Sequence, residues 1–125
     1  MREIKFRGKQ KNGGEWIYGY LFCIWQQAYI LWGTVNGNPD MKEVIPESVG
    51  KFTGIKDKNG KEIYESDLIR DDAGYLWCVA FGKGEFYLYS KEESIRPDRR
   101  INERLKYLEV IGNEFESNAS LQKNA

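Results

Sequence analysis

Apolar and polar residues alternate in short runs along most of the chain, with turn-forming residues between the runs. Residues 3–7 alternate strictly, residues 16–25 are aromatic and β-branched, and residues 28–32 follow after a polar Gln26-Gln27 break. A period of two among residues of this type is the pattern of β-strands. The first third of the chain therefore predicts two or three strands.

Turn formers interrupt this pattern in residues 33–40, where Asn-Gly and Asn-Pro stand close together. Both dipeptides tolerate or preset turn geometry, so this segment predicts a loop. Pro46 lacks the N–H that a central strand must donate. Residues 44–49 are therefore expected to form an edge strand at best.

A meander of short strands is predicted after residue 50. Asn59-Gly60 separates two apolar runs and predicts a hairpin in which these residues take the positive-φ positions of a type I′ turn. The strands are expected at residues 51–57, 62–64, 67–70, 75–81 and 85–90, with a closing strand at 105–112. Regularly spaced short strands of this kind are typical of a barrel or a sandwich.

The expected fold class is therefore mainly β, with little helix. We expect an N-terminal β-strand cluster at residues 1–50 and a small barrel-like or sandwich meander at residues 51–116. The polar residues 117–125 are expected to form a disordered tail. At 125 residues the chain is long enough to bury one hydrophobic core without a metal or a disulfide.

Composition removes several classes of function. The chain has 19 basic and 19 acidic residues, so no overall field draws it to nucleic acid or to an anionic membrane. It contains no histidine, which is the commonest general base and metal ligand. This excludes triad hydrolases and most zinc sites. We expect no catalytic residue, no metal and no cofactor, and therefore no enzyme.

Two further features concern the environment of the protein. Cys23 and Cys78 both lie in apolar runs, where free cysteines are usually buried, so both are expected to be core thiols. The start of the chain shows no secretion signal and no apolar run approaches the length of a membrane span. A cytoplasmic protein without membrane contact is expected.

One group of carboxylates is dense enough to consider for metal binding or paired acid–base chemistry. It consists of Glu62, Glu65, Asp67, Asp71 and Asp72. Aspartate in a turn, however, commonly accepts local backbone hydrogen bonds. The others alternate with apolar residues, as solvent-facing side chains of a strand do. The solvent-facing interpretation is favoured over a catalytic or metal role.

A basic segment follows the predicted meander and could pair with phosphates. It contains Arg96, Arg99, Arg100, Arg104 and Lys106. Aromatic residues precede it in the sequence, and cationic grooves with stacking rings are typical of single-strand binders. Acidic residues interleaved with the arginines nearly cancel their charge. Nucleic-acid binding through this segment is therefore an alternative that is not favoured.

The N-terminal strands carry the second candidate surface, an aromatic run. Its candidate interaction residues are Trp16, Tyr18, Tyr20, Trp25 and Trp32. Strict alternation places Trp16, Tyr18, Tyr20 and Phe22 on one face, with apolar residues also on the other. One face must belong to the core. The other is either covered by a second sheet of the same domain or is a contact surface for a partner or a second copy.

Three stretches in order resemble the YopX family of small bacteriophage and prophage proteins. They are IKFRGKQKNGGEWIYGYL, VGKFTGIKDKNGKEIYESDLIR and LEVIGNEFE, which take the resemblance to about Glu116. Ser66 departs from the glycine that the family commonly has in this turn. The resemblance implies a mainly β fold and a phage or prophage setting, and the family has no established activity.

Together these observations predict a non-enzymatic phage or prophage accessory protein in the bacterial cytoplasm. It is expected to act by protein–protein interaction or by self-association through the aromatic run. Nucleic-acid binding by the segment at residues 96–106 is the alternative.

Overall fold

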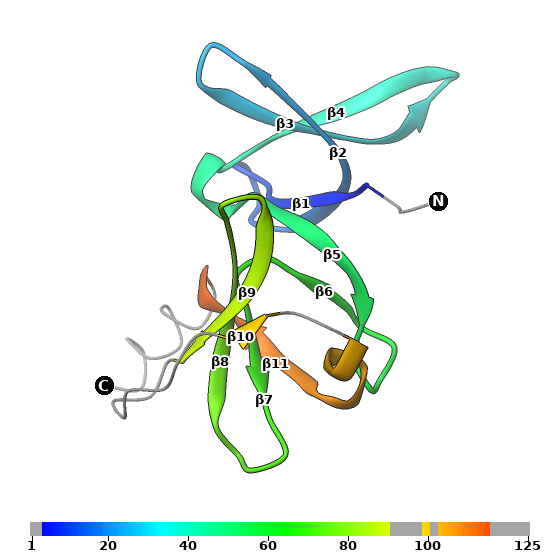
Figure 1. Cartoon of the computed structure of the whole chain (residues 1–125). Coiled ribbons are helices and arrows are strands. Elements are labelled where there is room, and N and C mark those ends of the chain that lie inside the picture. Colours follow the sequence, from blue (N-terminus) through cyan, green and yellow to red (C-terminus); the bar gives the residue numbers. More distant parts are fainter. Residues whose placement is uncertain (1–3, 91–98, 101–102, 116–125) are drawn as a thin grey trace. The chain divides into compact units, whose positions relative to one another are not determined.

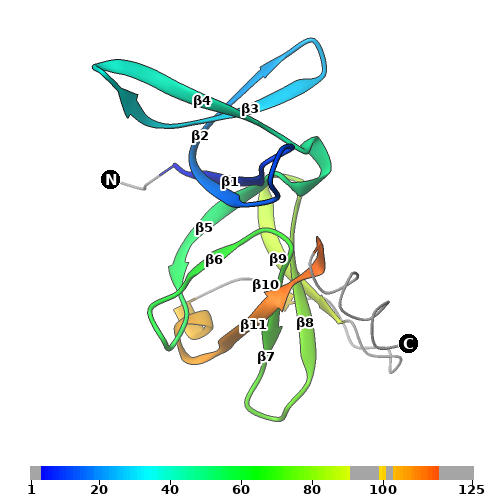
Figure 2. The same ribbon diagram turned by 180° about the vertical axis from the view of Figure 1, so that it is seen from behind.

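The computed structural model describes residues 4–90, 99–100 and 103–115 and shows a mainly β chain, as predicted (Figure 1). The chain divides into two compact units, Met1–Phe52 and Thr53–Ala125. The strands form two antiparallel sheets, and the described strands close neither of them into a barrel (Figure 2). The helical elements are short 3-10 helices, η1 (Pro46–Ser48) and η2 (Glu103–Tyr107).

The first unit is built on one sheet. Its strands are β1 (Phe6–Lys9), β2 (Trp16–Ile24), β3 (Gln27–Val35), β4 (Asn38–Val44) and the start of β5 (Gly50–Lys56). The sheet order is β4-β3-β2-β1-β5-β6, and the pairings from β4 to β5 are antiparallel. Beyond β1, Gln10 forms a bridge with Val44, which brings the end of β4 back beside β1.

The predicted loop at residues 33–40 is wrong. β3 continues to Val35 and β4 begins at Asn38, so a two-residue turn replaces the loop. Asn36 and Gly37 have φ angles of 52° and 80°, the left-handed pair that a type I′ hairpin turn requires. Pro39 is accommodated because β4 is the edge strand of its sheet.

Residues 44–49 also differ from the prediction of an edge strand. β4 ends at Val44, and Pro46 begins η1, where its fixed φ suits the first position of a helical turn. The Ser48 hydroxyl donates to the carbonyl oxygen of Ile45 at 2.6 Å and accepts from the backbone N–H of Lys9 at 2.8 Å. This serine joins the connection to β1.

The second unit contains the predicted meander. Its strands are β6 (Glu62–Tyr64), β7 (Asp67–Arg70), β8 (Leu76–Gly82), β9 (Glu85–Ser90), β10 (Arg99–Arg100) and β11 (Glu109–Asn113). Five of them form a sheet in the order β10-β9-β8-β7-β11. Its core cluster consists of Ile63, Ile69, Trp77, Val79, Leu88, Leu105 and Val110. Residues 105–112, predicted as one closing strand, form the end of η2 followed by β11.

The hairpin between β5 and β6 is confirmed, but its turn type is not the predicted one. Gly60 has a φ of 82°, whereas Asn59 is not among the positive-φ residues. The N–H of Gly60 donates to the carbonyl oxygen of Asp57 at 3.0 Å, and the N–H of Asp57 donates to that of Lys61 at 2.8 Å. This is a three-residue turn with glycine in the left-handed position, which the Asp57 side chain reinforces.

Candidate interaction surface

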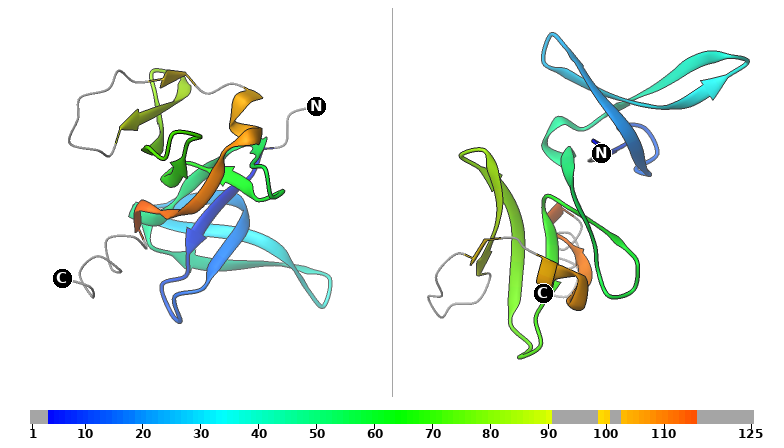
Figure 3. Two further views of the ribbon diagram at one scale, coloured as in Figure 1. Left: turned by 90° about the horizontal axis from the view of Figure 1, so that it is seen from below. Right: turned by 45° about the vertical axis from the view of Figure 1, so that its right-hand side comes forward.

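Strands β2, β3 and β4 form a twisted ribbon with two different faces (Figure 3). Paired residues in antiparallel strands project to the same face. Tyr20, Leu31 and Met41 therefore form one row across the ribbon. Leu21, Ile30 and Lys42 form a row on the opposite face.

The face with Ile30 is the core of the first unit. Its buried residues are Ala28, Ile30 and Val44, with Phe6, Ile17, Leu21 and Val49 packed against them. Among the described residues this cluster has three buried members, fewer than the seven of the second unit. The ribbon thus buries little of its apolar surface in its own core.

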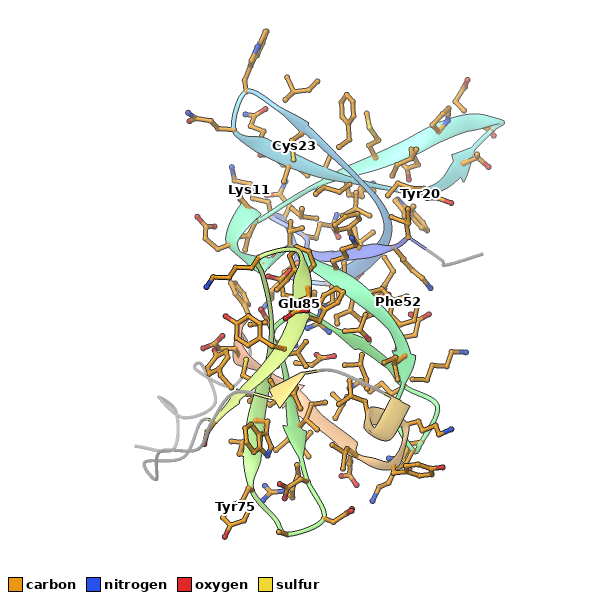
Figure 4. The ribbon with its side chains drawn as sticks, viewed as in Figure 1. Lys11, Tyr20, Cys23, Phe52, Tyr75 and Glu85 are labelled. Carbon is orange, nitrogen blue, oxygen red and sulfur yellow. The ribbon has the colours of Figure 1, made fainter. Side chains whose placement is uncertain are left out.

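The opposite face exposes large apolar side chains. Tyr20 on β2 is 64% exposed (Figure 4), and Phe22 on the same strand and Met41 on β4 are also exposed. Tyr18 and Ile24 lie on the same side of β2. Trp32 on β3 is also exposed, but it lies at the register shift after Leu31 and outside the rows of this face. We call the exposed aromatic residues on this side of β2 and at its tip the aromatic surface, which comprises Tyr18, Tyr20, Phe22 and Trp25.

Trp25 lies at the tip of the β2–β3 hairpin. It is 91% exposed, the largest exposure among the large apolar residues of the described chain. Ile24 pairs with Gln27, so Trp25 and Gln26 form the two-residue turn. Their φ angles are 48° and 69°, both in the left-handed region that bulky residues avoid.

Trp16 differs from the other candidate residues because it is half-buried. The guanidinium of Arg7 lies over its ring, 4.9 Å from the centroid. Lys9 pairs with Trp16 and Arg7 with Tyr18, which places both cations on the aromatic side of β2 near its start. Trp16 therefore lies at the basic border of the aromatic surface.

The prediction that both cysteines are core thiols holds for Cys78 and is wrong for Cys23. Cys78 on β8 is buried, whereas Cys23 on β2 is exposed (Figure 4). Cys23 pairs with Ala28 on the core side of the ribbon. It stands next to the hairpin tip, however, where the small core no longer covers it. An apolar sequence neighbourhood therefore did not establish burial.

The basic segment is only partly described. Arg96 lies outside the described residues, and so does the predicted tail at 117–125. Arg99 and Arg100 form β10, opposite Leu88 and Tyr87 of β9. Arg104 falls within η2. Lys106 is exposed, with its ammonium 5.2 Å from the ring centroid of Tyr107, and Tyr107 is itself 63% exposed.

The described contacts of the acidic group are local. Asp71 accepts from the N–H groups of Ala73 and Tyr75 through Oδ1 and from the Trp77 indole through Oδ2. Asp67 is buried, so the solvent-facing prediction is wrong for it, and it accepts from the backbone N–H of Tyr64 at 2.7 Å. The Tyr64 hydroxyl donates to Glu62 at 2.8 Å. These carboxylates thus hold turns and strand ends.

Sequence reasoning missed one buried carboxylate that accepts several backbone hydrogen bonds, Asp57. It is buried and accepts from Asn59 and Lys61 through Oδ1 at 2.8 and 2.9 Å, and from Val110 through Oδ2 at 3.0 Å. Burial raises the pKa of this carboxyl, but the three backbone donors and the charge of Lys61 together hold it below its usual value. Asp57 therefore ties the β5–β6 hairpin to β11. In the sequence, only the position of Asp57 two residues before Asn59-Gly60 indicates that its side chain could stabilise a turn.

A second unpredicted group joins β8, β9 and the end of β11. The Tyr89 hydroxyl donates to both carboxylate oxygens of Glu114 at 3.2 Å, and the Cys78 thiol donates to one of them at 3.6 Å. Burial, followed by the contacts with Cys78 and Glu114, raises the pKa of the Tyr89 hydroxyl. The hydroxyl therefore stays a hydrogen-bond donor, and the group anchors residue 114 to the sheet.

The described part of the chain contains neither a metal-ligand cluster nor a membrane-spanning helix. No group of three or more His, Cys, Asp or Glu side chains there could hold a metal ion. No helix in that part is long and apolar enough to cross a membrane.

The fold defines a small, mainly β protein of two units with an exposed aromatic ribbon. The model of the YopX family, described as "YopX protein", matches residues 5–122. The chain therefore belongs to the YopX family, which confirms the resemblance seen in the sequence.

The fold is also similar to a solved structure, the crystal structure of protein EF1440 from Enterococcus faecalis. The TM-score is 0.56, with 18% sequence identity over 97% of this chain and 99% of that chain. At this identity the likeness concerns the fold alone. No functionally curated protein matches the sequence.

Proposed function

We propose that the protein is a non-enzymatic accessory protein of a phage or prophage, working in the bacterial cytoplasm. It acts by binding protein, either a different protein or a second copy of itself, through the aromatic surface. The phage setting is what the family resemblance implies. The binding surface is argued from the structure of the first unit.

The observation that carries the proposal is the exposed apolar face of the β2–β3–β4 ribbon. Tyr18, Tyr20 and Phe22 alternate along β2, Trp25 stands at the tip of the hairpin, and all four are exposed. Contiguous exposed apolar patches mark contact surfaces, and aromatic residues and methionine are enriched at the centre of such interfaces. A ribbon that buries only one face has the other available for a partner.

The non-enzymatic part of the proposal is supported by the use of the carboxylates. Asp57, Asp67 and Asp71 each accept backbone N–H groups within the second unit. Carboxylates committed in this way stabilise the fold. If Mg²⁺ or Mn²⁺ raised the melting temperature of the protein, this part would be wrong, because a ligand of the native state must stabilise it.

The test is photo-crosslinking in the bacterium that carries the gene. A benzophenone amino acid replaces Tyr20 in one version of the full chain and Tyr107 in the control, since these tyrosines have nearly equal exposures of 64% and 63%. We expect a discrete protein adduct from position 20 and none of comparable yield from position 107. Equal yields, or no adduct from position 20, would remove the aromatic surface as the binding site.

Nucleic-acid binding is the second candidate, because β10 brings Arg99 and Arg100 beside β9, and Lys106 stands next to the exposed Tyr107. The check is a titration of tryptophan fluorescence with single-stranded DNA, duplex DNA and RNA at low and physiological salt. Saturable binding that weakens with salt and is lost in the Arg99→Ala, Arg100→Ala variant would favour this candidate. Unchanged affinity in that variant would remove the segment from consideration.

A further inference from the structure

The exposed ribbon carries no charge along its first hairpin. No charged residue occurs between Glu15 and Asp40, although 30% of the chain is charged. This interval contains β2, the turn at Trp25 and the whole of β3. Charged residues are ordinarily found at exposed positions. The solvent-facing side of this hairpin therefore lacks charged residues, just as its core side does.

The charges nearest this hairpin lie at its border. Glu43 on β4 shares a row with Phe22 and Tyr29, and its carboxylate is 3.2 Å from the ammonium of Lys11. At the start of β2, Arg7 lies over the ring of Trp16. The aromatic surface thus has an uncharged centre with a solvent-accessible ion pair, Lys11 and Glu43, at its β4 edge, as in interfaces that have a polar rim.

The turn at the tip is the second observation. At the other end of the same ribbon the chain uses Asn36-Gly37, whose φ angles of 52° and 80° suit those residues. At the β2–β3 end the same kind of turn is made by Trp25 and Gln26, at 48° and 69°. Trp25 is 91% exposed, so it has almost no packing role within the chain. Turn formation and packing therefore give no reason for tryptophan at this position.

We infer that Trp25 is an anchor that inserts into an uncharged, apolar pocket of a different protein, with Tyr20 and Phe22 packing around the mouth of that pocket. A charged partner surface would lose hydration against this hairpin and find no ion to pair with, so the partner must match it in lacking charge. Tryptophan is enriched among interface hot spots, which lie in desolvated pockets. The inference rests on the proposed function and specifies the partner's chemistry.

The test uses the full chain with the crosslinker at position 20 and a second change at one of two exposed tryptophans. Trp25→Ser is expected to lower the adduct yield about tenfold or more, as loss of a hot spot does. Trp32→Ser is the matched control and should lower it less than about threefold. Circular dichroism and the melting temperature establish that both variants fold.

The ionic strength and the site of the adduct test the chemistry of the pocket. Crosslinking in lysate should give the same yield from about 0.05 to about 1 M NaCl, because apolar contacts are not screened by salt. Mass spectrometry of the adduct should locate the crosslink in an uncharged, apolar segment of the partner. Adducts that fade with salt or map to a charged segment would overturn this inference and leave the proposed function standing.

Three other outcomes also decide against the pocket. An adduct of twice the mass of the chain would assign the surface to a second copy. Trp25-dependent cosedimentation with phosphatidylcholine vesicles would assign the tip to a bilayer surface, where tryptophan also favours the interface. The absence of any adduct at position 20 would overturn the proposed function itself.

Discussion

The carboxylate of Asp57 accepts backbone hydrogen bonds from Asn59, Lys61 and Val110. In Asp57→Asn the side-chain oxygen can still accept from Asn59 and Lys61, but the amide NH2 then faces the N–H of Val110. Both groups are donors, so no hydrogen bond forms between them. Loss of a charge-assisted bond in a buried place should cost about 2 kcal/mol of unfolding free energy. Urea denaturation measures this cost, with Asp72→Asn in an exposed turn as the control.

The pH dependence of the same pair of proteins gives a separate prediction. Because the pKa of Asp57 is lowered in the folded state, its stabilisation is present in full above the unfolded-state pKa of about 4. The stabilisation is lost as the pH falls through the lower folded-state pKa. The stability difference between the wild type and Asp57→Asn should therefore be largest above about pH 5 and shrink below about pH 4. A difference that grew on acidification would contradict the role given to Asp57.

Ser66 has a φ of 77°, in the left-handed region that favours glycine. It stands where the YopX family commonly has glycine. Ser66→Gly removes the strain of a Cβ in this conformation, which should stabilise the folded state by about 1 to 2 kcal/mol. Glycine also increases the conformational entropy of the unfolded chain, which offsets part of that gain. A net gain of about 0.5 to 1 kcal/mol is expected from thermal unfolding. Ser66→Ala keeps the Cβ and should show no gain; equal stabilisation by both would point to the hydroxyl instead.

Close approach of β2 to β3 depends on Gly19. A Cβ at this position would meet the backbone carbonyl oxygen of Leu31, which cannot move aside as a side chain can. Gly19→Ala should therefore part the two strands and cost about 1 to 3 kcal/mol, the usual penalty of overpacking. Gly33 on β3 is the control, since a Cβ there meets nothing within 4 Å.

Chemical denaturation of the two alanine variants measures the difference. A Gly19→Ala protein as stable as Gly33→Ala would show that the ribbon is not held at this spacing. If Gly19→Ala also lowered crosslinking from position 20, the effect would be attributed to the geometry of the aromatic surface, because Gly19 itself presents no side chain.

The strands that the sequence predicted best are those whose pattern and turns are local. β6, β7 and β9 have the predicted bounds, because they are short apolar runs between clear turn formers. β4 was missed because Pro39 suggests a loop unless the edge position of the strand is known. The carbonyl oxygen of Glu43 accepts from the N–H of Lys11, so the backbone polar groups of Glu43 point away from β3. The backbone groups of every second residue in a strand point the same way, so those of Pro39 also point away from β3. The N–H that proline lacks therefore removes no hydrogen bond between β4 and β3.

The features that could not be predicted from the sequence depend on contacts between distant segments. The bond between Asp57 and Val110 joins residues that are far apart in the chain, and no local pattern encodes it. The aromatic run of β2 was apolar on both faces, so periodicity alone could not say which face is buried. Its exposed face is known only once β3 and β4 are placed beside it.

The two units have separate cores, which share no buried residue. The first is much smaller, with Ala28, Ile30 and Val44 fully enclosed, and stability rises with the apolar area that a unit buries. Native-state hydrogen exchange should therefore show weaker protection for the amides of β3 than for those of β7 and β8. A ribbon of low local stability also suits a surface that adjusts to a partner.

A matched pair of variants tests whether the units open separately. Ile30 and Ile69 are both completely buried, one in each core, and Ile→Val removes the same methyl group from each at a cost of about 1 kcal/mol. If the units open independently, Ile30→Val should lower protection only in β2 to β4, and Ile69→Val only in β7 to β11. If either variant lowers protection equally throughout, β5, which runs through the boundary at Phe52, couples the two units into one cooperative fold. In that case the aromatic surface would share the stability of the whole chain, and the adjustability argued for it would be lost.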